Sequence, residues 1–341
     1  MDAKKLAYNL MIIALILTAL YVGKDLLIPF IVALVVWYLL NSLRRLVAKI
    51  RFGKEREAPW YIQLFIAASF LFSISWFLAK LVASNFEKFV EHYPTYHDNI
   101  LEYSEYVTKN LDLPLSVDEM IKGYDLPNLM TELLNSSWSL FSTFVLVMIY
   151  VVFIILEERV FPKKLKSMFS SKEGYGNFIK TIGKIDEKIS MYLSAKTALC
   201  FLTAVVSYVI LIVFGVDFAI LWSFLIFLLT FIPFIGAFVG VIFPTLIAFI
   251  QFEGYIDAVL VFTLLTTVML VIGNFVEPKV LGDRLNLSPL SVIIALSFWG
   301  ALWGIAGMFL CVPITVILMI IFAQFPTTRP VAILLSGGKI D

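Results

Sequence analysis

Long apolar runs, separated by short polar segments, set the pattern of the whole chain. Eight stretches are apolar along nearly their whole length, at residues 6–22, 26–40, 60–79, 138–156, 198–214, 218–232, 257–276 and 303–323. About 20 apolar residues are enough for a helix to cross the hydrocarbon core of a bilayer. The pattern therefore predicts an all-α integral membrane protein with about eight transmembrane helices.

Two shorter apolar pieces, residues 235–250 and 290–300, are interrupted by glycine and proline. The surrounding sequences are "FIPFIGAFVGVIFPTL" and "FWGALWGIAGMFLCVPIT", with Pro233, Gly236, Gly240 and Pro244 in the first and Gly300, Gly304, Gly307 and Pro313 in the second. Backbone that leaves the helix at membrane depth must be buried in protein or line a wet cavity. We expect two broken or re-entrant helices in the C-terminal half, as around the binding site of a secondary transporter. The alternative is that these glycines only let plain helices pack closely.

The composition agrees with a membrane protein. Hydrophobic residues make up 61% of the 341 residues and charged residues 15%, against about 45–50% and about 25% in soluble domains. The two cysteines, Cys200 and Cys311, both lie in apolar runs. We interpret them as packing residues rather than a disulfide or a metal pair.

The basic residues predict the orientation of the chain in the membrane. The loop 41–59 carries six lysines and arginines and the segment 157–197 carries nine, whereas 80–137 has four basic and ten acidic residues. Since short cytoplasmic loops are rich in lysine and arginine, we expect the first two segments inside and the acidic one outside. With eight spans, both termini then lie in the cytoplasm and the protein lies in the cytoplasmic membrane.

These patterns divide the chain into five parts. Residues 1–83 hold three transmembrane helices and a basic cytoplasmic loop, and 84–137 form an acidic, helical segment outside the membrane. Residues 138–197 hold the fourth span and a basic amphipathic helix, "FIKTIGKIDEKISMYL", at the inner surface. Residues 198–324 form the transport core with its re-entrant segments, and 325–341 a cytoplasmic tail.

Enzyme signatures do not occur in the sequence. It has no His-Glu-x-x-His zinc motif, no Gly-x-Ser-x-Gly elbow and no Walker lysine loop. The two histidines, His92 and His97, lie five residues apart without further ligands at metal-site spacing, so solvated surface is favoured over a metal site. We therefore expect a protein that is not an enzyme, that uses no cofactor or metal, and that would draw on a gradient for any transport.

The stretch "NFVEPKVLGDRLNLSPL", residues 274–290, concentrates charges and helix breakers between two apolar runs. Its notable residues are Asn274, Glu277, Pro278, Lys279, Gly282, Asp283, Arg284, Ser288 and Pro289. The two acids and two bases can neutralise one another at a membrane boundary, and Ser288 with Pro289 can begin the next helix. Two interpretations stay open: a salt-bridged boundary loop, or a hinge in which Glu277 or Asn274 contacts a solute or a coupling ion.

The two glycine-rich regions and this charged stretch together resemble the signature of the autoinducer-2 exporter family. The resemblance is strong over about residues 186–323. It implies an eight-span transporter with re-entrant segments and a ring-shaped homo-oligomer, a pentamer being one candidate. It points to Asn274, Glu277, Pro233, Gly236, Gly304 and Gly307 along the substrate or ion pathway, and to Pro278, Gly282, Asp283, Arg284, Pro289 and Pro313 at the hinge.

The leading hypothesis is a gradient-driven secondary transporter that exports a small polar solute such as autoinducer-2. The resemblance also implies an alternative, sodium (lithium)/proton exchange, because some relatives are reported as antiporters. Antiport usually needs a carboxylate inside the membrane, whereas Asp217, Glu253, Asp257 and Glu277 all lie at predicted span ends. A third alternative is a non-transporting membrane scaffold. The expected partners are the bilayer, a small solute or monovalent cation, and further copies of the chain, with no nucleic acid.

Overall fold

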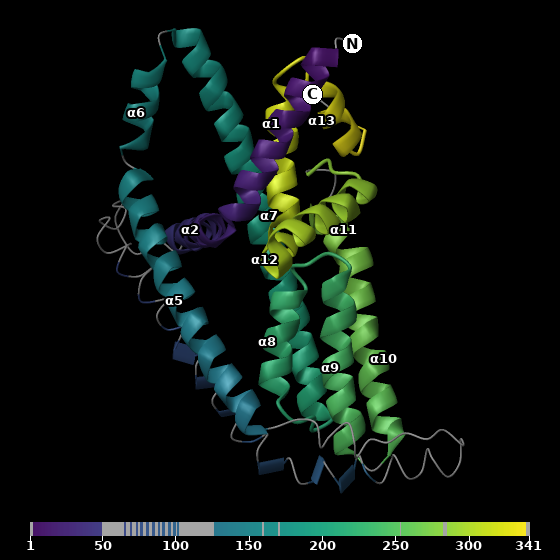
Figure 1. The fold of residues 1–341 in the computed structure, drawn as a ribbon. Helices are drawn as coiled ribbons and strands as arrows, with labels where there is room; N and C mark the ends of the chain where they lie inside the picture. The colour runs from purple at the N-terminus through teal and green to yellow at the C-terminus, as the bar shows by residue number, and fades with distance from the viewer. Residues whose placement is uncertain are drawn as a thin grey trace. The chain divides into compact units, whose positions relative to one another are not determined.

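A computed structural model describes residues 3–49, 126–158, 160–169, 171–252, 254–281 and 285–338, with scattered positions between 65 and 101 (Figure 1). The described helices are α1 (Ala3–Val22), α2 (Lys24–Lys49), α5 (Leu126–Glu158), α6 (Phe161–Met168), α7 (Lys172–Val213), α8 (Ala219–Leu229), α9 (Ile235–Gln251), α10 (Tyr255–Val271), the π-helix η1 (Ile272–Val276), α11 (Glu277–Leu281), α12 (Pro289–Ala323) and α13 (Arg329–Leu335). The all-α fold class is confirmed.

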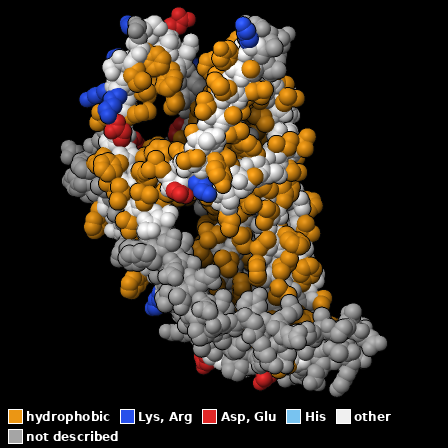
Figure 2. Space-filling model, in the orientation of Figure 1, with side chains coloured by type: hydrophobic (Ala, Val, Ile, Leu, Met, Phe, Trp, Pro, Cys, Tyr) orange, Lys and Arg blue, Asp and Glu red, His pale blue; other side chains and the backbone are white. Residues whose placement is uncertain are grey.

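Four described helices are long and apolar enough to cross a membrane: Lys24–Ser42, Lys172–Val213, Tyr255–Leu281 and Pro289–Ala323. Apolar side chains cover most of the described surface in view (Figure 2). A surface of this kind is stable against lipid rather than water. The predicted span at 60–79 lies almost entirely outside the described residues.

The chain forms two compact units, which are described separately. Unit 1 comprises Met1–Phe65, Thr143–Ala195 and Leu281–Asp341, and unit 2 comprises Ile66–Ser142 and Lys196–Val280. Helix α7 contributes to both units. Its 42 residues extend about 63 Å, so the predicted amphipathic helix and the predicted span at 198–214 are one continuous helix. The predicted domain boundary at 197 falls inside it.

Unit 1 is held together by hydrogen bonds between segments far apart in the sequence. The indole of Trp303 in α12 donates to the Leu20 carbonyl in α1 at 3.0 Å, and the hydroxyls of Ser42 and Ser194 lie 2.8 Å apart. The end of the chain is also tied down, because Ser288 N–H donates to the Leu335 carbonyl and Gly337 N–H to the Asn286 carbonyl. The predicted tail at 325–341 thus contains a helix, α13, that is fastened to the start of α12.

Unit 2 contains a bundle in which α8 packs against α9 and α9 against α10 (Figure 1). Its core joins the end of α7 to these helices through Leu211, Ile226, Val241, Val261 and Leu265, which have little or no exposed surface. Helix α8 has 11 residues, about 17 Å, and is too short to cross a hydrocarbon core of about 30 Å alone. The full span predicted at 218–232 is therefore the short first arm of a helical hairpin.

Two described residues of the segment that the sequence predicts outside the membrane, Tyr96 and Asn99, bond to the ends of this bundle. The hydroxyl of Tyr96 donates to the Asp217 carboxylate at 2.6 Å, and the amide of Asn99 donates to the Ile250 carbonyl at 2.8 Å. Burial, followed by the bond to Asp217, raises the pKa of Tyr96 above its ordinary value, so the phenol stays protonated as a donor. Nδ1 of His92 lies 2.8 Å from the Lys88 carbonyl, to which it can only donate, and His97 lies outside the described residues.

The two predicted breaks occur, and only the first lies beside a proline, Pro233. The first lies before α9, where Phe234 has a φ of 63°; the second is Gly304 within α12, with φ 61° and ψ −141°. Pro244 and Pro313, by contrast, lie inside helices that continue through them. The backbone of Pro313, a predicted hinge residue, is helical, and its role as a hinge stays a prediction.

Each break is followed by a glycine that lies against the backbone preceding it. A Cβ on Gly236 would overlap the Leu229 carbonyl, and a Cβ on Gly307 would overlap the Trp299 carbonyl. Only glycine allows backbones to approach this closely. Each of the two glycine-rich regions of the sequence therefore contains a chain reversal, one in each unit, at which a glycine allows two backbone segments to touch.

We expect alanine at either position to destabilise the protein. Gly236→Ala or Gly307→Ala should cost about 3 kcal/mol, because backbone must move to admit the methyl group. Gly183→Ala is the matched control: Gly183 lies in α7 with open space around it, and alanine there should stabilise the helix by up to about 1 kcal/mol. Thermal unfolding in detergent measures all three. Equal melting temperatures for Gly236→Ala and wild type would contradict the packing role.

Candidate functional site

The least expected side chain in unit 2 is Lys196. It lies in α7 within the apolar sequence "LSAKTALCFL" and is 3% exposed. Removing an ammonium ion from water costs several kcal/mol unless an opposite charge and hydrogen bonds compensate. A lysine in this position therefore needs an acidic partner.

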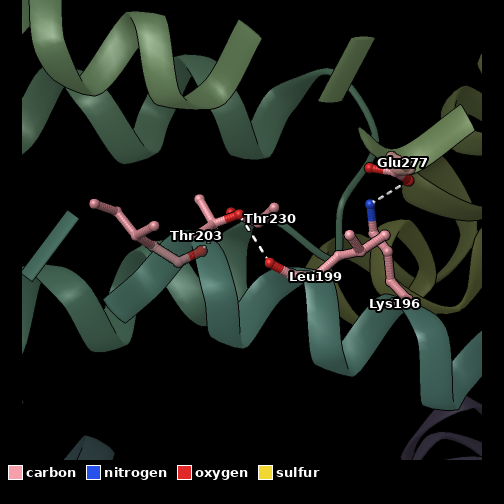
Figure 3. A network of polar contacts seen from close by, with 6 residues as sticks. Lys196, Leu199, Thr203, Thr230 and Glu277 are labelled. Carbon is pink, nitrogen blue, oxygen red and sulfur yellow. Dashed lines mark hydrogen bonds and ion pairs between the residues drawn. The ribbon is translucent and has the colours of Figure 1, made fainter. Parts of the chain in front are cut away.

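That partner is Glu277, 81 residues further along the chain. The ammonium Nζ of Lys196 donates to Oε1 of Glu277 at 2.6 Å (Figure 3). The two partners differ in access: counting side-chain atoms alone, Lys196 is 4% exposed and Glu277 is 26% exposed. The carboxylate is thus the end of the pair that a proton, a cation or a solute can reach.

A π-helix places Glu277. In η1, the N–H of Glu277 donates to the Ile272 carbonyl five residues back. Pro278 follows directly, has no N–H to donate, and would press its ring against the Asn274 carbonyl in a regular α-helix. The wider π-turn relieves that clash, and π-turns inside helices are frequent at functional sites. The helix then continues past Pro278 to Leu281 rather than ending there.

Hydroxyl groups extend the polar region beyond the ion pair. Thr203 in α7 and Thr230 at the end of α8 belong to the same polar network (Figure 3). Each donates to the carbonyl four residues earlier, Thr203 to Leu199 at 2.9 Å and Thr230 to Ile226 at 2.6 Å. Their oxygens still have lone pairs that can accept hydrogen bonds. The site therefore combines one ion pair with neutral hydrogen-bonding groups.

Comparison with known proteins identifies the family. The model of the AI-2E family transporters matches residues 10–327. The chain belongs to the AI-2E transporter family. It is 30% identical to the AI-2 transport protein TqsA of Escherichia coli K12, over 98% of this chain and 96% of that protein. It is 28% identical to the transport protein YhhT of the same organism, over 96% and 93%, and 35% identical to a transport protein of Borreliella burgdorferi, over 65% and 61%.

The resemblance to AI-2E transporters noted in the sequence is thus confirmed across nearly the whole chain. The relatives are transport proteins, and this chain is a membrane protein of their family. The long apolar helices agree with that assignment.

The predicted pathway residues of this AI-2E transporter fall into separate groups. Glu277 lies in the ion pair and Asn274 in the π-helix, where it is exposed. Pro233 and Gly236 form the first chain reversal, in unit 2, and Gly304 and Gly307 the second, in unit 1. Their roles in a pathway stay predictions.

The predicted hinge is described in part. Gly282, Asp283 and Arg284 lie outside the described residues. Pro289 is the first residue of α12, and the Ser288 hydroxyl accepts from Ser291 N–H at 3.1 Å, the helix cap that the sequence predicts. Among the described residues Glu277 forms an ion pair with Lys196, which lies outside its own loop, and the salt-bridged loop and the hinge both stay predictions.

Sequence reasoning missed Lys196. Its charge was counted with the basic cytoplasmic segment 157–197, which ends directly before the predicted span at 198–214. The available signal was local: residues 189–195 and 197–203 on either side contain no charge. A lone lysine inside an apolar helix, paired with a lone glutamate in another, is the pattern to look for.

Breaking the pair on one side should destabilise the protein. Lys196→Met leaves the Glu277 carboxylate without its counter-ion and should cost about 3 kcal/mol, whereas Lys196→Met with Glu277→Met should recover most of the loss. The matched control is Lys164→Met, which breaks the exposed pair of Lys164 with Glu157 at 2.7 Å and should change stability by less than about 1 kcal/mol. Thermal unfolding would disprove a buried pair if the two single variants melted alike.

Proposed function

We propose that this protein is a gradient-driven secondary transporter in which the Lys196–Glu277 pair couples solute movement to proton movement. The observation that carries the proposal is an ion pair between two helices that are both long enough to span the membrane, with the lysine almost fully buried. Ionisable groups at membrane depth are expensive and typically mark ion pathways and proton relays.

The pair provides a simple coupling device. With Glu277 ionised, the attraction to Lys196 holds α7 and the π-helix region together. Protonation of Glu277 removes that attraction, and a solute that hydrogen-bonds to the carboxylate competes with the lysine for it. The ion pair thus has two states, formed and broken, and a ligand or proton that favours one of them shifts the population toward that state. Proton and solute therefore act on the same atoms.

The solute we propose is a small, polar, uncharged organic molecule, exported across the cytoplasmic membrane. Thr203, two helical turns along α7 from Lys196, and Thr230 offer neutral hydrogen-bonding groups, which suits a hydroxylated solute. The name of the AI-2 transport protein TqsA makes autoinducer-2 the first solute to test. We further propose that both termini lie in the cytoplasm, on the strength of nine basic residues at 157–197.

Sodium (lithium)/proton exchange is the second candidate. The sequence mildly disfavoured it, because the carboxylates of the apolar spans, Asp217, Glu253, Asp257 and Glu277, all lie at predicted span ends. The buried partner of Glu277 weakens that objection, since a carboxylate held against an embedded lysine can exchange the lysine for a proton or a monovalent cation.

Transport assays in liposomes distinguish these functions. The purified protein is reconstituted with a pH-sensitive dye inside, and either an autoinducer-2 gradient without sodium or a sodium gradient alone is imposed. We expect the solute gradient to drive proton movement, and Glu277→Gln to reduce it by at least about tenfold, since a factor of ten corresponds to only about 1.4 kcal/mol of lost coupling.

Lys279→Gln is the matched control, because Lys279 is two residues away and exposed and should transport like wild type. Proton movement driven by sodium alone would establish the antiport alternative. Folded protein that moves neither solute nor protons would favour a scaffold. Solute transport unaffected by Glu277→Gln would remove the pair from the mechanism.

A further inference from the structure

The part of α5 that belongs to unit 1 carries an exposed apolar stripe. Val145, Ile149, Phe153 and Leu156 follow one another at intervals of four, four and three residues, and each is 40–64% exposed. Side chains at this spacing share one face of a helix, and an exposed apolar stripe in a membrane protein is stable against lipid. The stripe therefore marks a lipid-facing surface that reaches the last turn of α5.

The membrane boundary lies where this stripe ends. Glu157 and Glu158 follow Leu156 directly and end α5. The indole of Trp37 in α2 donates to the Glu158 carboxylate at 3.1 Å, and tryptophan is enriched at membrane–water interfaces. Helix α6 begins only three residues after Glu158, so it starts at the membrane surface.

The sequence around α6 is strongly basic. Residues 159–172 contain five lysines and arginines and no acidic residue. The three lysines of α6 are exposed, and Figure 2 shows their blue side chains gathered over this helix. Lys164 pairs with Glu157 at 2.7 Å, whereas among the described residues neither Lys163 nor Lys166 forms an ion pair. Because eight residues of helix extend about 12 Å, both of these charges lie close to the boundary.

The other face of α6 is apolar. Phe161, Leu165 and Met168 are spaced by four and three residues and share one side of the helix, while Lys163 and Lys166 fall on the opposite side. Only Leu165 is buried; Phe161 is 48% exposed and Met168 is 75% exposed. A helix with exposed apolar residues on one face and lysines on the other suits a membrane surface.

We propose that α6 binds anionic phospholipids at the membrane surface. Lys163 and Lys166 contact the phosphates, and Phe161 and Met168 reach toward the acyl chains. Clusters of about four to eight basic residues directly after a transmembrane helix attract anionic lipid, and the adjoining stripe on α5 already faces lipid. This surface is separate from the Lys196–Glu277 pair and does not depend on the proposed transport.

Energy transfer in vesicles tests the lipid surface without any transport measurement. The full-length protein, in a C200A/C311A background, carries a donor dye on Met168→Cys in phosphatidylcholine vesicles with increasing phosphatidylglycerol. Traces of either lipid with an acceptor dye report which one lies beside α6. We expect a preference for phosphatidylglycerol. Lys163→Gln with Lys166→Gln should raise the half-saturating fraction at least about fivefold, because one lysine near an anionic surface contributes about that factor.

Lys180→Gln with Lys184→Gln is the matched control. It removes the same charge from exposed positions in α7, where Asp186 and Glu187 follow in the sequence, and should change the half-saturating fraction by less than about twofold. Ser167→Cys, also exposed, provides a second position for the dye. A rise in melting temperature on adding phosphatidylglycerol to the unlabelled protein in detergent, smaller in the Lys163 and Lys166 variant, is the expected independent result.

Two results would overturn the proposal. The first is equal transfer to the two lipids, or a preference that survives Lys163→Gln with Lys166→Gln. The second is transfer to neither lipid together with transfer between labelled copies of the protein, which would assign α6 to a contact between copies of the chain. Because no solute is added, either failure is distinguishable from failure of the transport assay.

Discussion

The cost of burying one lysine constrains the architecture of unit 2. Lys196 is 3% exposed in a helix that is otherwise apolar around it, and an ammonium ion there is tolerable only beside a carboxylate. Glu277 can supply that carboxylate because the π-helix and Pro278 set its position at the start of α11. The pair thus fixes the register of two helices whose sequences are 81 residues apart. It also makes that register sensitive to the charge of a single carboxylate.

The two chain reversals show how this fold handles backbone inside a membrane. Lipid cannot satisfy free N–H and C=O groups, so each break must be sealed by protein. At Gly236 and at Gly307 the helix after the break lies directly on a carbonyl five residues before the break, that of Leu229 and of Trp299 respectively, which leaves no space for a side chain. The same solution in both units explains why the two glycine-rich regions look related in sequence. It also explains why the first arm, α8, is too short to be a span.

The sequence was sufficient for the fold class, the family and the existence of two breaks, because these depend on apolar length and on glycine. It was misleading about Pro244, Pro278 and Pro313, since all three lie in helices. A helix accommodates a proline where the preceding turn widens or the helix bends. The hydrophobic periodicity of the sequence reveals neither adjustment. It also missed the ion pair. Local charge balance pointed only to bases in the loop around Glu277, whereas the ion pair with Lys196 depends on a tertiary contact between α7 and α11. No pattern within either segment encodes that contact.

The central claim is that Glu277 changes its protonation state when the transporter binds solute. Infrared difference spectroscopy of the reconstituted protein measures this directly, as the spectrum with autoinducer-2 minus the spectrum without it. We expect the wild-type difference spectrum to show a gained protonated-carboxyl band and a lost carboxylate band. The difference spectrum of Glu277→Gln should show neither change. Identical difference spectra for wild type and Glu277→Gln, with solute bound to both, would contradict it and leave the Lys196–Glu277 pair as a purely structural contact.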